Sequence, residues 1–329
     1  MAAPYPVSIL DLATVRHGQP IAESLKESTE LAVLADELGF HRLWFAEHHN
    51  MATIASSATS VLLAHMGAHT TNIRLGAGGI MLPNHAPLVI AEQFGTLHEL
   101  YGDRIDLGLG RAPGTDQKTL MALRRTNQSA DRFPSDVLEL QSYLKGESRI
   151  PGINAYPGTG TNVPLILLGS SHFGAQLAAQ LGLSYSFASH FAPQMLESAA
   201  ALYRSEFTAS KDLAKPYFIA AANVIIADTQ QRAEELWERA KRARIRSMLG
   251  RGRQLSDDDV EQLVHSVAGQ QVLQMLEMTA VGTPAVVRDW LDDFVSRMNA
   301  NEVIVTNMAG PLEDRRRALQ LISEHIIQR

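Results

Sequence analysis

The sequence contains no cysteine. This absence excludes disulfide bonds, thiolate metal sites and cysteine nucleophiles, so histidine, aspartate and glutamate must carry any acid–base or metal chemistry. It also fits a reducing compartment. The chain has no apolar run long enough to span a membrane, and its first residues lack the basic and apolar pattern of a secretion signal. From these absences we expect a cytoplasmic protein without a membrane partner.

An excess of positive charge is also missing. The chain has 29 Lys and Arg against 35 Asp and Glu, a formal net charge of -6, which is not typical of a nucleic-acid-binding surface. Hydrophobic residues make up 45% of the chain and can fill a large core. No linker rich in Pro, Gly or Ser divides the 329 residues. We therefore expect a single domain, residues 1–329, that acts on a small molecule.

Apolar runs of strand length alternate with helical periodicity along the chain. The predicted strands cover residues 7–12, 42–46, 73–77, 105–109, 164–168, 185–188, 217–227 and 302–305. Eight parallel strands joined by right-handed crossover helices close into a barrel, so we predict an α/β protein with the (β/α)8 TIM-barrel fold. An open doubly wound sheet is the alternative. It would normally carry GxGxxG after its first strand, and residues 11–20 have no such motif.

Residues 229–279 break this alternation, because they contain two more helical patterns than a barrel needs. We predict a helical insertion there, after strand seven. The insertion carries a run of cations, namely Lys241, Arg242, Arg244, Arg246, Arg251 and Arg253. The ordinary interpretation is a solvated helix face. The alternative is a mobile flap whose cations approach an anionic cofactor when it closes.

The second predicted strand runs directly into Glu47-His48-His49. Polar groups at the carboxyl end of a barrel strand lie at the mouth, where such folds carry out chemistry. A metal hydrolase is one alternative. However, adjacent histidines at a strand end point in opposite directions and cannot easily bind one ion, and no third ligand is evident nearby. We therefore expect no metal.

Three more strands end in sequence suited to ligands. The pair Gly78-Gly79 follows the third strand and lets a flat ring approach the backbone, although a tight turn would use the same residues. Arg111 follows the fourth strand and suits a phosphate. Ser170 and Ser171 follow the fifth strand at a predicted helix start, where free amides bind anions, and Ser171 is also an ordinary helix cap.

With these motifs taken together, the chain resembles the luciferase-like monooxygenases, flavin-dependent barrels related to the bacterial luciferase α subunit. The resemblance covers nearly the whole chain. It rests on residues 47–49, 75–83, 111, 169–174, 178–183 and 281–284. Residues 187–191 further suggest the subgroup of relatives with no assigned substrate.

The resemblance implies a reduced FMN in the barrel mouth, its ring against a cis peptide bond between Gly78 and Gly79. It implies a catalytic role for His48, with Glu47 beside it. The phosphate ligands would be Arg111, Ser170, Ser171 and the amide of Gly174. The substrate would lie near His49, His190 and Asn223, although His190 is about as well explained as a structural histidine.

Three positions depart from luciferase itself. Ser170 stands where luciferase has a glutamate, Gly174 replaces a hydroxyl residue, and Gly110 replaces a reactive cysteine. Aldehyde oxidation and light emission are therefore not implied for this chain.

The function implied by the resemblance is an FMN-dependent monooxygenase. Reduced flavin from a separate reductase would react with O2 to oxygenate a small, largely apolar organic substrate. One alternative is hydride transfer with the deazaflavin F420, and another is a flavin-binding protein without catalysis. Relatives commonly pair through early barrel helices, and residues 55–68 are small enough for close packing, so we expect a homodimer.

Overall fold

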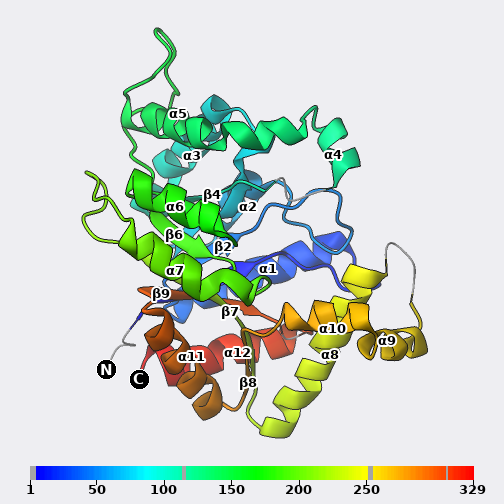
Figure 1. Cartoon of the computed structure of the whole chain (residues 1–329). Coiled ribbons are helices and arrows are strands. Elements are labelled where there is room, and N and C mark those ends of the chain that lie inside the picture. Colours follow the sequence, from blue (N-terminus) through cyan, green and yellow to red (C-terminus); the bar gives the residue numbers. More distant parts are fainter. Residues whose placement is uncertain (1–4, 113–115, 251–254, 309) are drawn as a thin grey trace.

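The computed structural model describes residues 5–112, 116–250, 255–308 and 310–329. Parallel strands alternate with helices along the chain (Figure 1). The strands are β1 Val7–Asp11, β2 Arg42–Phe45, β3 Arg74–Met81, β4 Ile105–Gly110, β5 Leu165–Gly169, β6 Ser184–Phe187, β7 Phe218–Ile226, β8 Thr279–Gly282 and β9 Glu302–Asn307.

The helices follow the periodicity of the sequence. They are α1 Ile21–Glu37, α2 Thr59–Gly67, α3 Pro87–Tyr101, α4 Gln117–Ala122, α5 Phe133–Lys145, α6 His172–Leu181, α7 Leu196–Ser205, α8 Gln230–Leu249, α9 Asp257–Val264, α10 Val267–Gln274, α11 Pro284–Met298 and α12 Leu312–Ile322. Among the helices of the described residues, none has both the length and the apolar composition needed to cross a bilayer.

Eight of the strands form a closed parallel barrel. In order around the barrel they are β1, β2, β3, β4, β5, β6, β7 and β9, with β9 pairing back to β1. Helices surround the barrel on the outside (Figure 1). The predicted (β/α)8 fold is therefore confirmed.

A ninth strand, β8, was not predicted from the sequence. It has four residues, and it pairs only with Asn223–Ile226 at the carboxyl end of β7. The pairing of β7 with β6 stops at Ala220, so the last part of β7 is free to accept this extra strand. A strand so short, with alternate residues only partly buried, leaves too little pattern to separate it from the helices around it.

The predicted insertion contains three helices, α8, α9 and α10, one more than the periodicity indicated. They pack on one another through a small apolar cluster of their own, which includes Ile245, Val260 and Val272. Of the six cations in the run described above, Arg251 and Arg253 lie outside the described residues.

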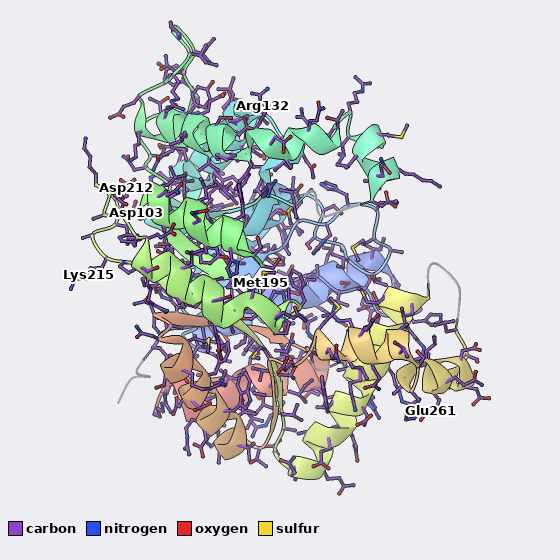
Figure 2. All side chains as sticks on the ribbon, viewed as in Figure 1. Asp103, Arg132, Met195, Asp212, Lys215 and Glu261 are labelled. Carbon is purple, nitrogen blue, oxygen red and sulfur yellow. The ribbon has the colours of Figure 1, made fainter. Side chains whose placement is uncertain are left out.

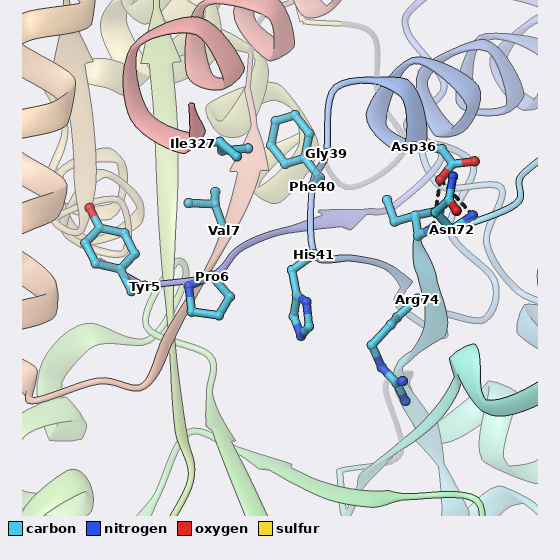
Figure 3. Close-up of a pocket in the computed structure, with 11 residues that line it drawn as sticks. Tyr5, Pro6, Val7, Asp36, Gly39, Phe40, His41, Asn72, Arg74 and Ile327 are labelled. Carbon is cyan, nitrogen blue, oxygen red and sulfur yellow. Dashed lines mark hydrogen bonds between the residues drawn. The ribbon is translucent and has the colours of Figure 1, made fainter. Parts of the chain in front are cut away.

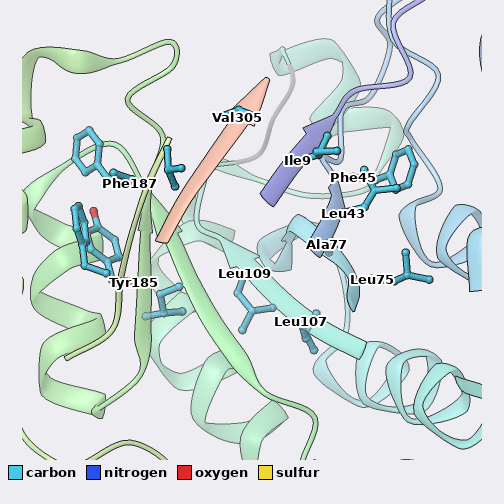
Figure 4. Packing of buried hydrophobic residues seen from close by; sticks show 14 of the residues in the cluster. Ile9, Leu43, Phe45, Leu75, Ala77, Leu107, Leu109, Tyr185, Phe187 and Val305 are labelled. Atoms are coloured by element: carbon cyan, nitrogen blue, oxygen red, sulfur yellow. The ribbon is translucent and has the colours of Figure 1, made fainter. Parts of the chain in front are cut away.

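The strands bury both of their faces, which explains their nearly continuous apolar sequence. Leu43 and Phe45 of β2 point outward into the layer between sheet and helices (Figure 4). Trp44, between them, points inward, because successive residues of a strand face opposite sides. The inward cluster consists of Leu10, Trp44, Ala46, Ile166, Ile219, Ala221 and Ile304.

A buried ion network closes the barrel at the amino-terminal ends of its strands. Arg42 donates to Asp106 at 2.7 Å and to Glu302 at 2.8 Å. Glu302 also accepts hydrogen bonds from Ser8 at 2.6 Å and from Tyr217 at 2.8 Å. Buried charges are tolerated when they are paired and fully hydrogen-bonded, so this network seals the floor of the barrel.

A hollow of about 630 Å³ lies outside this floor, bounded by the beginnings of β1 and β3 (Figure 3). Its polar side chains already have partners. Asp36 accepts the backbone amides of residues 71–73, and Arg74 makes two hydrogen bonds to Asp106. Because barrels of this type place their chemistry at the other end, we do not assign the hollow to the active site.

Replacing Glu302 by glutamine should destabilise the protein strongly. The amide nitrogen would face the donors of Arg42, Ser8 and Tyr217, and the buried guanidinium would lose half of its compensation. We expect the free energy of unfolding to fall by about 3 kcal/mol in urea denaturation. The matched control is Asp293→Asn, which removes an exposed ion pair with Arg297. This variant should change the free energy of unfolding by less than about 1 kcal/mol. Equal losses in the two variants would contradict the account of the floor.

Candidate active site

Glu47 follows β2 at the mouth of the barrel, and its carboxylate is almost completely buried. The oxygen Oε1 lies 2.7 Å from Nε2 of His49 and 2.8 Å from Nε2 of His85. The other oxygen, Oε2, accepts the backbone amide of Met81 at 3.1 Å. Since a carboxylate can only accept, both imidazoles donate to it. These bonds join the loop after β2 to the end of β3 and to the segment that follows.

The hydrogen bonds determine the charge of Glu47. Burial by itself would raise the pKa of this carboxyl group, but the bonds from His49 and His85 outweigh it and lower the pKa to about 2. The hydrogen bond to Glu47 in turn raises the pKa of His49. Glu47 is therefore an anion at any ordinary pH. It was expected to be catalytic, whereas its contacts suit a residue that positions the loop carrying His48.

His85 was missed in the sequence, because no motif marks it and its partner is 38 positions away. The position of His85 bears on whether this cluster could bind a metal ion. Glu47, His49 and His85 offer ligand atoms that all lie within 4.8 Å of one another, so a third candidate ligand does exist. The two imidazole–carboxylate distances are nevertheless those of direct hydrogen bonds, which account for the cluster without an ion.

His48 follows Glu47 in the segment after β2 and is partly exposed. It is close enough to His190, in the loop after β6, to influence the pKa of that residue. The barrel thus brings together two histidines that are 142 positions apart in the chain. From the sequence we expect His48 to be catalytic and His190 to line the substrate pocket.

Asn223 holds the loop that carries His190. Its amide nitrogen donates to the backbone oxygen of His190 at 2.7 Å, and its amide oxygen accepts from Thr306 at 2.5 Å. The side chain is 1% exposed and fully engaged. Asn223 was expected to line the substrate pocket, but these contacts give it a role in holding the loop.

The imidazole of His190 is itself buried, with 9% of the residue exposed. Burial lowers its pKa to about 3, and the charges of Arg244 and His48 act in the same direction. The ring is therefore neutral near pH 7. Its Nδ1 atom has no hydrogen-bond partner within the described residues.

The peptide bond between Gly78 and Gly79 is cis, as the resemblance implied. The two residues do not follow β3 but lie within it, because the strand continues to Met81 across a shift in its pairing with β4. A Cβ atom on Gly79 would lie 2.7 Å from the backbone oxygen of Gly108. Only glycine fits at this position, where the backbone turns toward the mouth.

Arg111 leaves β4 and lies against the first turn of α6. Its guanidinium carbon is 4.1 Å from the ring centre of Phe173, and its Nε contact with Ala130 is long, at 3.4 Å. Ser171 occupies the cap position of α6, but its side chain makes no capping hydrogen bond. The structure thus brings Arg111 to the segment that contains Ser170, Ser171 and Gly174. The first amides of a helix have no partner within the helix itself, so this segment suits a phosphate.

Comparisons with known proteins identify the family of the chain. The family described as luciferase-like monooxygenase matches residues 6–300. A luciferase-like monooxygenase from Escherichia coli (strain K12) is 48% identical over 301 residues, which are 91% of this chain and 90% of that protein. The crystal structure of apo-MsnO8 is similar with a TM-score of 0.87 and 34% identity, over 98% of both chains.

More distant structures share the fold. The oxygenating constituent of 3,6-diketocamphane monooxygenase from Pseudomonas putida, in complex with FMN, has a TM-score of 0.73 at 16% identity. The coenzyme F420-dependent tetrahydromethanopterin reductase from Methanopyrus kandleri has a TM-score of 0.69 at 16% identity. Each covers 98% of this chain, and 98% and 99% of its own. Barrels of this shape therefore serve both cofactors.

The neutral His190 should make the protein sensitive to acid. Its pKa is about 3 in the folded state and about 6.5 in the unfolded chain, so below pH 6.5 the unfolded state binds the proton first and stability falls. Between pH 7.5 and pH 4.5 we expect urea denaturation to show a loss of about 3 kcal/mol in the free energy of unfolding from this residue. The variant His190→Asn should lack that part of the loss. The same acid sensitivity in both proteins would show that His190 is not buried as a neutral ring.

Proposed function

Because the chain belongs to the luciferase-like monooxygenase family, we propose that it is an FMN-dependent monooxygenase. It would use reduced flavin and O2 to oxygenate a small, largely apolar organic substrate. The observation that carries the proposal is the close approach of Arg111 to the first turn of α6, at the same end of the barrel as the Gly78–Gly79 peptide. An anion site and a pair of residues without side chains, at one end of the barrel, suit a phosphorylated ring cofactor.

The residues present fit FMN. Arg111 offers a forked pair of donors, and the first turn of α6 adds the amide of Gly174 and the hydroxyls of Ser170 and Ser171. Tyr185 supports this segment, because its hydroxyl donates to the backbone oxygen of Ser171 at 3.2 Å. The departures from luciferase at Ser170 and Gly174 remove side-chain groups but leave these donors in place.

When bound, reduced FMN supplies the electrons that activate oxygen. The protein supplies position and proton transfer. His48 is the residue we assign to proton transfer, because a partly exposed imidazole can take and return a proton near pH 7. Glu47, held by His49 and His85, fixes the loop on which His48 is carried. His49, which is partly buried beside Glu47, remains our candidate for a residue that contacts the substrate.

The proposal extends to partners. A separate cytoplasmic reductase would deliver the reduced flavin, as the resemblance to the family implies. Pairing of two chains through the early helices would give a homodimer. The segment 55–68 remains our candidate for that contact, and Val61 of α2 is a largely exposed apolar residue there.

Arg111→Gln should weaken FMN binding at least tenfold in a fluorescence titration, because one charged phosphate ligand is lost. Riboflavin, which has no phosphate, should bind both proteins equally, and Arg132→Gln, at an exposed cation, should leave FMN binding unchanged. The same titration with F420 tests the alternative cofactor. Tight binding of F420 with weak binding of FMN would replace the proposal by hydride transfer.

His48→Ala should slow oxygen consumption by the complex with reduced FMN about 100-fold in single-turnover measurements, while FMN affinity stays the same. The control is His69→Ala, since His69 is exposed and contacts only its own helix region. An unchanged rate in His48→Ala would remove the assigned role. A wild-type complex that consumes no oxygen would indicate a flavin-binding protein without catalysis.

A further inference from the structure

Arg244 occupies an unusual place on α8. The face of this helix that packs on the barrel carries Ala233, Leu236 and Ala240, all buried against Ile225 and its neighbours. The next position on the same face, four residues further on, is Arg244. A charged side chain thus follows an apolar stripe that is directed at the barrel and not at solvent.

The two arginines that flank Arg244 in the run have partners. Arg242 pairs with Glu261, which is labelled on α9 in Figure 2, and Arg246 pairs with Asp257. The part of the chain that the structure describes offers no carboxylate to Arg244, which makes neither an ion pair nor a hydrogen bond there. The interpretation of the whole run as a solvated face is therefore wrong for Arg244.

An unpaired and partly buried guanidinium is costly for the protein. Burial lowers the pKa of Arg244 in the folded state, which means that its charge is poorly solvated. Proteins normally compensate such a charge with an acid or remove it. Its retention without a partner points to an anion that is not part of the chain.

A second observation comes from His190, whose Nδ1 atom is buried without a hydrogen-bond partner. Among the described residues, the charges of Arg244 and His48 act on this imidazole, and no carboxylate is found to do so. Arg244 of α8 and His190 of the loop after β6 therefore lie near each other and near His48, and neither has a hydrogen-bond partner for the groups in question within that part of the chain. A buried polar atom without a partner is rare enough to require an explanation.

We propose that Arg244 and His190 bind a carboxylate of the substrate. This inference rests on the proposed function, because it names the class of molecule that the flavin site would oxygenate, a small organic acid with an apolar body. The carboxylate is only bound and does not react. It would hold the apolar part beside His48, away from the flavin phosphate at β4 and β5.

A carboxylate suits these donors better than other groups. It is planar and has two oxygens, so one can accept from the fork of Arg244 while the other accepts from the neutral ring of His190. A neutral amide would leave the guanidinium uncompensated. The arrangement therefore selects for charge and not only for shape.

The experiment is calorimetric titration of the FMN-loaded protein with the linear carboxylates from butanoate to decanoate and with the matching primary amides. For the wild type, at least one carboxylate should bind ten times more tightly than its amide. Arg244→Gln should abolish this preference, a loss of about 1.4 kcal/mol or more, and Arg244→Lys should keep part of it. Arg242→Gln is the matched control on the same helix and should behave as wild type.

Two results would overturn the inference: amides that bind as well as carboxylates in the wild type, or a preference that survives Arg244→Gln. Weaker FMN binding in Arg244→Gln, with the carboxylate preference intact, would assign the cation to the cofactor. The melting temperature distinguishes a binding role of Arg244 from a structural role. Arg244→Gln should leave the melting temperature unchanged or raise it, whereas loss of a structural arginine would lower it. If FMN fails to bind but carboxylates bind selectively, the proposed function fails and the anion site stands.

Discussion

The carboxylate of Glu47 is the point on which the mouth of the barrel depends. It is buried, and its pKa is lowered to about 2. It accepts hydrogen bonds from two imidazoles and one backbone amide. A buried charge of this kind is stable only while all of its donors stay in place. The same bonds that compensate it therefore fix the loop after β2 against the end of β3, and with it the position of His48 relative to the Gly78–Gly79 peptide.

The two ends of the barrel treat polar groups differently. At the floor, Arg42, Asp106 and Glu302 satisfy one another, and nothing is left for a ligand. At the mouth, Nδ1 of His190 has no hydrogen-bond partner among the described residues, and Arg244 is partly buried without a carboxylate beside it there. Satisfied networks make a fold specific, whereas unsatisfied donors carry a cost that is retained where binding repays it. This contrast supports our proposal that the active site lies at the carboxyl ends of the strands.

The sequence predicted the eight barrel strands well, because their apolar runs are long and separated by clear helical patterns. It missed β8, which has four residues and pairs only with the end of β7. It placed Gly78 and Gly79 after a strand, although they lie within β3, since a shift in pairing leaves no local signal. His85 and the unpaired state of Arg244 could not be predicted, because both depend on contacts between residues far apart in the chain.

The central claim is that one end of the barrel holds a phosphorylated flavin in a defined orientation. A crystal structure of the protein grown with excess FMN tests this most directly. We predict electron density for the phosphate within hydrogen-bonding distance of Arg111 and the first turn of α6, with the ring facing the Gly78–Gly79 peptide and His48 at its edge. Flavin bound at the hollow near Tyr5 and Arg74, or with its phosphate directed at Arg244, would contradict the account.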